Sequence, residues 1–362
     1  EDDLEIRRAR EVAQLMSIGV TDPVEQSQIL GYDATLYWSP MPKPVESKQV
    51  KHQSNAPSTS PAAPAAARPP EDPAKMGKGQ KQQEKQRVLG PAVVDMRSPI
   101  ACGSFKNAYL GTMGDETILV LKHRGGGSEG NSEIQKEVAI LGCISQHPHV
   151  VHCLGTFRYG DGGVCIALEW CKYGILSDWL AQKGNKVSVP QKHDIIQQIC
   201  LGMRHVASCR IIHRDLAAHN ILIHNENPIL AKITDFGMAV RMGHPIPPPK
   251  PFAGGSQEKE VIAVRWAAPE ILRSEHVWSA PWSEKSDVWA FGVTAWQVYA
   301  NGEVPFTLSV AESAVKLQVL KGSTLSRHAD CTEEDWAMMV RCWTSDAGVR
   351  PKFSDLCKQS NS

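Results

Sequence analysis

The stretch His213-Arg214-Asp215-Leu216-Ala217-Ala218-His219-Asn220 carries a carboxylate and, five residues later, a carboxamide. A second carboxylate follows fifteen residues after Asn220, in Asp235-Phe236-Gly237. One carboxylate of such a set can orient a hydroxyl group, and the other can hold metal ions together with the carboxamide. These are the requirements of phosphoryl transfer, in which alignment and charge neutralisation matter more than covalent chemistry.

The two segments resemble the catalytic loop and the metal-binding turn of eukaryotic protein kinases. The Leu-Ala-Ala run after Asp215, in place of Leu-Lys, is of the tyrosine-kinase type. The resemblance implies an α+β fold with two lobes: a small N-terminal antiparallel sheet plus one helix, and a larger, mainly helical C-terminal lobe. It also implies ATP and Mg²⁺ as cofactors and proteins as substrates.

The resemblance assigns a role to each polar residue of these segments. Asp215 is expected to align the acceptor hydroxyl, and Asn220 and Asp235 are expected to hold the metal ions. Arg214 corresponds to the arginine that senses the activation segment, and His213 to a structural histidine.

Lys122 ends an apolar run at residues 119–122 that resembles the family's Val-Ala-Ile-Lys strand. It is therefore expected to bind the α- and β-phosphates, although a lysine that closes an apolar strand is more often just a solvated end. Val120 takes the place of the alanine that lies against adenine. Glu137, on the next predicted helix, resembles the partner that forms an ion pair with this lysine, and Glu133 is its rival.

The glycine-rich loop of the family, Gly-x-Gly-x-x-Gly-x-Val, is the part that fits least. Residues 101–108 keep only Gly103, because Ala101 and Lys106 replace the outer glycines and Ala108 replaces the valine. Side chains at these positions are expected to loosen ATP binding or to reshape the loop. Lys106 either compensates with its positive charge or points to solvent.

The hinge of the nucleotide site is predicted in the strand at residues 166–171. Leu168 takes the gatekeeper position, and the backbone from Glu169 to Cys171 is expected to bond adenine. Leu222 would form the floor beneath the ring, although apolar strand residues are ordinarily core. In full, the residues expected to bind the nucleotide are Ala101, Gly103, Phe105, Ala108, Val120, Lys122, Leu168, Glu169, Cys171 and Leu222.

Three later segments complete the resemblance. Trp266-Ala267-Ala268-Pro269-Glu270 resembles the end of the activation segment, and Ser286-Asp287-Val288-Trp289-Ala290-Phe291-Gly292 resembles a buried anchoring helix. Asp287 is expected to bind the backbone of the catalytic loop. Arg350 is expected to pair with Glu270 in a structural role.

The chain departs from the tyrosine-kinase pattern at two places, which bear on its substrate and on its regulation. Tyrosine kinases usually carry arginine where this chain has His219, which weakens the tyrosine assignment. The segment from residue 235 to 270 contains no tyrosine, and Ser256 is its one hydroxyl-bearing residue. We therefore expect Arg214 to be satisfied by Glu258 or Glu260 instead of by a phosphate.

The sequence thus predicts a protein kinase that transfers the γ-phosphate of ATP to a protein hydroxyl, with tyrosine favoured. The alternatives are a serine/threonine or dual-specificity kinase, and a pseudokinase scaffold with weakened nucleotide binding. A formal net charge of zero over 362 residues gives no indication of a nucleic-acid partner. The ten cysteines are scattered, which is typical of reduced thiols in a cytoplasmic protein. The chain would be a soluble enzyme or the intracellular part of a membrane receptor.

Composition divides the chain into three parts. Residues 1–40 are predicted to be a helical flank of unknown role, and residues 41–87 a disordered linker rich in Pro, Ala, Lys and Gln. Any membrane contact is expected through the region upstream of the chain or through this basic linker. Residues 88–362 form the predicted kinase domain, with lobes at about 88–170 and 171–362. Periodicity predicts strands at 117–122, 150–157 and 164–170 and helices at 132–144 and 189–208, with a buried helix around 288–293.

Overall fold

The computed structural model describes residues 92–102, 106–124, 128–144, 146–159, 163–244 and 262–357. All of them belong to one compact unit of the chain. The predicted flank at 1–40 and linker at 41–87 lie outside the described residues. So do Gly103 and Phe105 of the nucleotide site, and Glu258 and Glu260.

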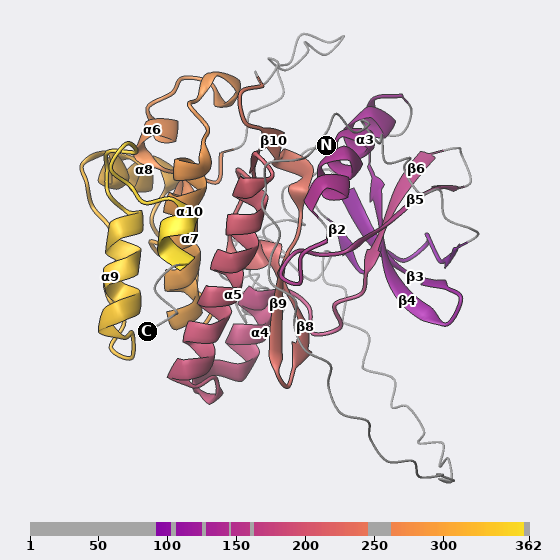
Figure 1. Ribbon diagram of the computed structural model, residues 1–362, viewed down its shortest axis with the longest axis horizontal. Coiled ribbons are helices and arrows are strands. Elements are labelled where there is room, and N and C mark those ends of the chain that lie inside the picture. The colour runs from indigo at the N-terminus through magenta and orange to yellow at the C-terminus, as the bar shows by residue number, and fades with distance from the viewer. Residues whose placement is uncertain are drawn as a thin grey trace, which may run out of the picture. The chain divides into compact units, whose positions relative to one another are not determined.

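The first part of the described chain is an antiparallel sheet with strand order β1-β3-β4-β6-β5, in which β2 pairs with β3 (Figure 1). A two-residue turn joins β3 to β4, and Gly114 in that turn has φ +61°, which suits glycine. The strands are β1 (Val93–Val94), β2 (Ala101–Cys102), β3 (Lys106–Met113), β4 (Glu116–His123), β5 (Cys153–Tyr159) and β6 (Gly163–Glu169).

The two faces of this sheet belong to two different hydrophobic clusters. On the inner face, Leu119 and Leu121 pack into the main core together with helix α3 (Ser128–Ile144). On the outer face, Ile118 and Val120 are fully buried in a second cluster. This outer cluster comprises Val94, Tyr109, Ile118, Val120, Phe157, Cys165 and Ala167.

Strand alternation then assigns each neighbouring residue to a face. Successive side chains of a strand point to opposite faces, and residues directly opposite each other on paired strands share a face. Lys122 therefore lies on the outer face with Val120. Ala108 is opposite Leu121 in the register, so Ala108 and Lys106 lie on the inner face.

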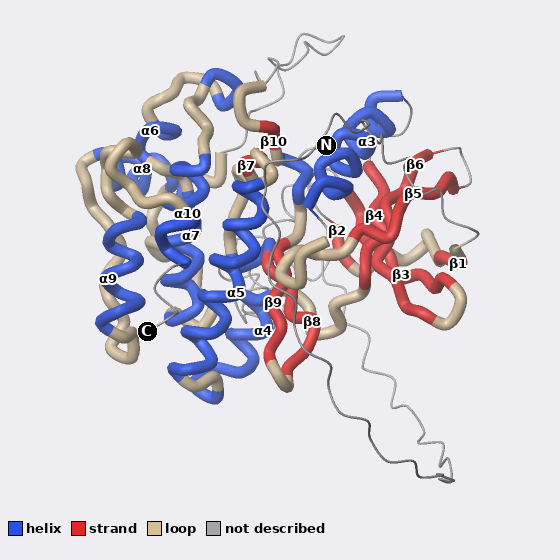
Figure 2. Tube along the Cα trace, in the orientation of Figure 1, coloured by secondary structure: helices blue, strands red, loops and turns tan. Residues whose placement is uncertain are grey.

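The second part of the described chain is mainly helical (Figure 2). Helix α5 (Val189–Ser208) begins with a capping box formed by Ser188 and Gln191. It lies between the strand pair β8 (Ile221–Glu226) and β9 (Ile229–Ile233) on one side and helix α7 (Glu284–Tyr299) on the other (Figure 1). Helix α7 is buried from Ser286 to Tyr299. The helices are α4 (Leu176–Lys183), α5 (Val189–Ser208), α6 (Pro269–Leu272), α7 (Glu284–Tyr299), α8 (Glu312–Leu320), α9 (Glu333–Cys342) and α10 (Phe353–Leu356).

Two short antiparallel pairs and several 3₁₀ turns connect these helices. The pairs are β7 (Ile211–Ile212) with β10 (Val240–Arg241), and β8 (Ile221–Glu226) with β9 (Ile229–Ile233). The 3₁₀ turns are η2 (Gly184–Lys186), η3 (Ala218–Asn220), η4 (Phe236–Met238), η5 (Val264–Trp266) and η6 (Val277–Ser279). Within the described ranges, no helix combines the length and the apolar character that crossing a bilayer demands.

The predicted fold class is confirmed, and so are the main elements. The strand expected at 117–122 is β4, the helix expected at 132–144 is α3, and the helix expected at 189–208 is α5. The buried helix expected around 288–293 is the centre of α7.

Two helical glycines give a matched pair of stability predictions. A Cβ at Gly202 in α5 would lie 2.6 Å from Ile233 Cδ1 and 2.7 Å from the His149 carbonyl oxygen, which is held by the Ile233 N–H. Gly202→Ala should therefore lower the free energy of unfolding by about 1–3 kcal/mol. Gly142 in α3 is exposed and has no atom within 4 Å of such a Cβ, so Gly142→Ala should raise it by up to about 1 kcal/mol. Urea unfolding of the two variants measures both, and equal effects would contradict the packing argument.

Candidate active site

The β8–β9 pair brings the two predicted metal-holding residues together. Ile221 at the start of β8 is opposite Ile233 at the end of β9. Asn220 therefore adjoins Thr234, whose N–H donates to the Asn220 carbonyl oxygen at 3.0 Å. Asp235 follows directly, with φ +56°, and accepts a hydrogen bond from the Gly237 N–H. The sequence distance of fifteen residues between Asn220 and Asp235 is thus closed by one hairpin.

Asn220 is tied to the predicted catalytic aspartate. Its Nδ2 donates to the Asp215 carbonyl oxygen at 2.7 Å and to the Asp215 Oδ2 at 2.9 Å. Both amide hydrogens are therefore directed toward Asp215, which leaves the amide oxygen Oδ1 as the atom of Asn220 that a cation would take. Oxygen donors from Asn220 and Asp235 are of the kind that Mg²⁺ prefers, so the residues present fit this metal.

The backbone of the catalytic loop is held from helix α7. Asp287 accepts hydrogen bonds from the His213 N–H at 2.7 Å and from the Arg214 N–H at 2.9 Å. Burial raises the pKa of the Asp287 carboxyl to about 6, although His213 and these backbone donors act against the rise. The predicted contact between Asp287 and the catalytic loop is confirmed.

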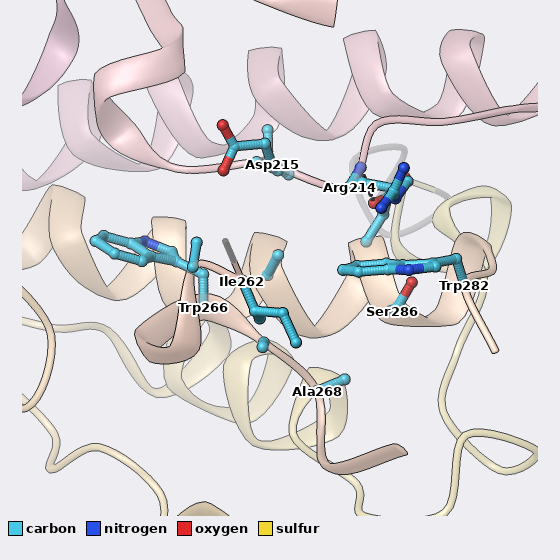
Figure 3. Close-up of a pocket in the computed structure, with 12 residues that line it drawn as sticks. Arg214, Asp215, Ile262, Trp266, Ala268, Trp282 and Ser286 are labelled. Atoms are coloured by element: carbon cyan, nitrogen blue, oxygen red, sulfur yellow. Dashed lines mark hydrogen bonds between the residues drawn. The ribbon is translucent and has the colours of Figure 1, made fainter. Parts of the chain in front are cut away.

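Arg214 contacts the segment that follows the metal-binding turn. Its Nη1 donates to the Met238 carbonyl oxygen at 3.1 Å. Its guanidinium lies over the ring of Trp282, 4.6 Å from the centroid (Figure 3). The expected partners Glu258 and Glu260 lie outside the described residues, so that expectation stays a prediction.

A pocket opens beside the catalytic loop, between that loop and residues 262–268. Figure 3 shows Asp215 above Trp266, Arg214 above Trp282, and Ile262 between the two indole rings. The walls of the pocket are therefore largely aromatic and apolar, with the Asp215 carboxylate at one end of the pocket.

A buried cation connects the sheet to the metal-binding turn. Lys106 Nζ lies 2.7 Å and 2.8 Å from the two carboxylate oxygens of Glu137 and 2.9 Å from Asp235 Oδ1. Burial alone would lower the pKa of Lys106, but Asp235 and Glu137 outweigh it and raise this pKa. Burial also raises the pKa of Glu137, because one ammonium group shared by two carboxylates compensates it incompletely. Burial opposes the charge of Asp235 as well, but Lys106 outweighs it and lowers that pKa.

The expected pair of Lys122 with Glu137 is wrong, since Glu137 binds Lys106. The physical reason is the face of the strand: Lys122 shares the outer face with Ile118 and Val120, and Glu137 points to the inner face. Val120 is likewise buried in the outer cluster, so it does not take the expected place against adenine. Leu119 and Leu121 are the residues of β4 that face α3.

Sequence reasoning missed Lys106 as a member of this site. The indication in the sequence was that a lysine replaces the third glycine of the loop. The sequence alone did not decide where the side chain of this lysine points. The run at β4 could not correct the error, because residues 118–121 are apolar on both faces and either register of the family motif fits them.

The predicted hinge residues Leu168, Glu169 and Cys171 lie at the end of β6 and just after it. Leu168 is buried in the main core, and Cys171 is buried with its Sγ 3.7 Å from His224 Nδ1. The Glu169 carboxylate accepts hydrogen bonds from the His152 N–H and from Lys232 Nζ, each at 2.7 Å. The side chain of Glu169 is thereby fixed to β9, across the junction between the sheet and the helical part.

The other predicted nucleotide contacts are divided between the two parts. Ala101 is exposed on β2 and pairs with Ala108, which is opposite Leu121 on the inner face. Leu222 lies on β8, bridged to Ile175, and packs against the main core.

The predicted pair of Arg350 and Glu270 is confirmed as well. Arg350 is fully buried, and its guanidinium donates to both oxygens of Glu270, at 2.8 Å and 3.1 Å. This bidentate pair joins the end of the activation segment to the loop before α10.

Comparisons with known proteins agree with this arrangement. A family model described as protein tyrosine and serine/threonine kinase matches residues 94–359. The chain is 28% identical over 281 residues to the epidermal growth factor receptor of Apis mellifera, a match that covers 76% of this chain and 20% of the receptor. It is 33% identical over 220 residues to ephrin type-A receptor 7 of Gallus gallus, covering 61% and 21%. It is 29% identical over 281 residues to the tyrosine-protein kinase Fer of Mus musculus, covering 76% and 32%. The chain thus spans about a fifth to a third of the length of these relatives.

Proposed function

Since the chain belongs to the protein tyrosine and serine/threonine kinase family, we propose that it transfers the γ-phosphoryl group of ATP to a tyrosine hydroxyl of a protein. The observation that carries the proposal is the convergence of Asp215, Asn220 and Asp235 in one place, joined by hydrogen bonds between their segments. Family membership alone would not supply this, because the chemistry resides in the site.

Each residue then has a task that its surroundings support. Asp215 accepts the hydrogen bond of the incoming hydroxyl and aligns it with the phosphorus atom. Asn220, through Oδ1, and Asp235 would hold Mg²⁺, which supplies charge neutralisation on the phosphate oxygens. Glu137 positions the ammonium group of Lys106 beside Asp235. Arg214 couples the catalytic loop to the activation segment through its hydrogen bond to the Met238 carbonyl oxygen.

Trp266 beside Asp215 and the tyrosine-kinase relatives support tyrosine as the acceptor. A flat ring gains about 0.5–1.5 kcal/mol from a well-placed aromatic neighbour, whereas the ring of Trp282 is covered by the Arg214 guanidinium, 4.6 Å from its centroid. Fer, one of the relatives, is a tyrosine-protein kinase. A serine/threonine or dual-specificity kinase is the second candidate, favoured by His219, whose ring meets Trp266 edge-on at 5.5 Å in place of the usual arginine.

We place the kinase domain at residues 88–362, with residues 1–40 as a flank and 41–87 as a linker. We place the protein in the cytoplasm, either as an independent enzyme or as part of a receptor. All ten cysteines are free, which supports a reducing compartment.

Phosphoamino-acid analysis tests this function. The full chain is incubated with ATP, Mg²⁺ and two peptide substrates that differ in a tyrosine or a serine at the acceptor position. We expect phosphotyrosine on the first peptide and little product on the second. Phosphoserine as the main product would establish the second candidate. Absence of both products, together with no Mg²⁺-dependent nucleotide binding, would establish a scaffold.

A further inference from the structure

We propose that Lys106 on strand β3, and not Lys122 on strand β4, is the lysine that binds the phosphates of ATP in this chain. The inference rests on the proposed function and adds to it the identity of a catalytic residue. It also reinterprets the third position of the glycine loop, where the lysine supplies a function in place of the glycine.

The first argument is the place of the ammonium group. Lys106 Nζ bridges Glu137 on α3 and Asp235 of the metal-binding turn, with oxygen atoms at 2.7–2.9 Å. A Cβ on Gly237 would lie 3.1 Å from this Nζ, so the ammonium group lies directly over the turn. Phosphates that reach a metal on Asp235 must therefore come within reach of Lys106.

The second argument is what occupies β4. Leu121 is the residue of β4 that faces the inner side opposite Ala108, and it packs against the main core. Its side chain cannot carry a charge to the phosphates. Lys122 follows on the outer face, with Asn107 opposite it, so the sheet separates it from Glu137 and Asp235.

The third argument is the charge balance around Glu137. This carboxylate is 4% exposed and would be costly to bury without a cation. Lys106, with a side chain that is 14% exposed, supplies that cation from a neighbouring strand. The family's lysine on the strand that corresponds to β4 is thus replaced by a lysine on β3. The ion pair between that lysine and the glutamate of the helix is kept.

Three variants of the full chain test the assignment. Lys106→Met removes the ammonium group, and Lys122→Met removes the lysine on the outer face of β4 as the matched control. The double variant Lys106→Gly/Leu121→Lys moves the lysine to the inner face of β4. We expect Lys106→Met to reduce kcat/KM for peptide phosphorylation by about 10²–10³-fold. We expect Lys122→Met to stay within about twofold, and the transplanted lysine to recover at least about tenfold over Lys106→Met.

A second readout separates this proposal from the proposed function. An ATP analogue with a reactive acyl phosphate transfers its acyl group to the lysine amine nearest the phosphates, with release of the nucleotide, and peptide mapping locates the product. Acylation of Lys106 supports the inference even if no peptide is phosphorylated. Acylation of Lys122, or a loss of activity in Lys122→Met equal to that in Lys106→Met, overturns it. Failure of the wild-type chain to bind the analogue overturns it as well.

Lys106→Arg serves as the control for folding, because it keeps a positive charge beside Glu137 and Asp235. The planar guanidinium does not reproduce the point charge of an ammonium group. We expect this variant to keep the thermal midpoint of the wild type and to lose at least about tenfold in kcat/KM. Full activity in Lys106→Arg with inactive Lys106→Met would show that any cation there serves structure alone, and would also overturn the proposal.

Discussion

Asp215→Asn should reduce the rate of phosphoryl transfer by about 10²–10⁴-fold. The asparagine has nearly the shape of the aspartate, and its amide oxygen can still accept the hydrogen bond from Asn220 Nδ2, observed at 2.9 Å. What it loses is the carboxylate that, in the proposed function, accepts the hydrogen bond of the acceptor hydroxyl. The initial rate of peptide phosphorylation at saturating ATP measures the effect.

Nucleotide binding and the thermal midpoint serve as controls for this variant. Both should match the wild type, because Asp215 has no role in holding ATP. A residual rate within tenfold of the wild type would contradict the role assigned to Asp215. This conclusion would hold for a serine/threonine kinase as well as for a tyrosine kinase.

Arg350→Met should lower the free energy of unfolding by about 3–5 kcal/mol. Arg350 is fully buried and donates to Glu270, to the Thr344 carbonyl oxygen at 3.1 Å and to the Lys285 carbonyl oxygen at 2.5 Å. Removing it leaves the Glu270 carboxylate and two carbonyl groups without these donors. The thermal midpoint should fall on the order of 10 °C, as measured by circular dichroism.

Two further variants make this prediction specific. Arg97→Met removes an arginine whose ion pair with Asp95 is exposed, and the midpoint should not move measurably. Adding Glu270→Gln to Arg350→Met should restore part of the loss, because the stranded charge is then neutral. If the double variant is as unstable as the sum of the single ones, charge is not the cause.

The sequence predicted most of the helical part of the site, and the reason is local. Asp215, Asn220 and Asp235 lie in short motifs whose backbone shape and side-chain types are set within a few residues. The contact of Asp287 with the loop and the pair of Arg350 with Glu270 were predicted through the same resemblance, and the structure confirms both. The catalytic roles of Asp215, Asn220 and Asp235 remain predictions.

The sheet part could not be predicted to the same degree. A shift of one residue in register exchanges the two faces of a strand, and residues 118–121 are apolar throughout, so no polar residue fixed the inner face of β4. The bond from Lys232 to Glu169 joins residues 63 positions apart. Such contacts depend on the packing of the two parts and leave no periodic signal in the sequence.

The shared face of Lys106 and Leu121 has an evolutionary consequence. The two positions lie on adjacent strands and project to the same side, with Ala108 paired to Leu121 two residues beyond Lys106. An ancestor with a lysine at both positions would have carried two ammonium groups near Glu137, and either could later be lost. A lineage can therefore exchange one arrangement for the other without ever passing through a chain that lacks this lysine.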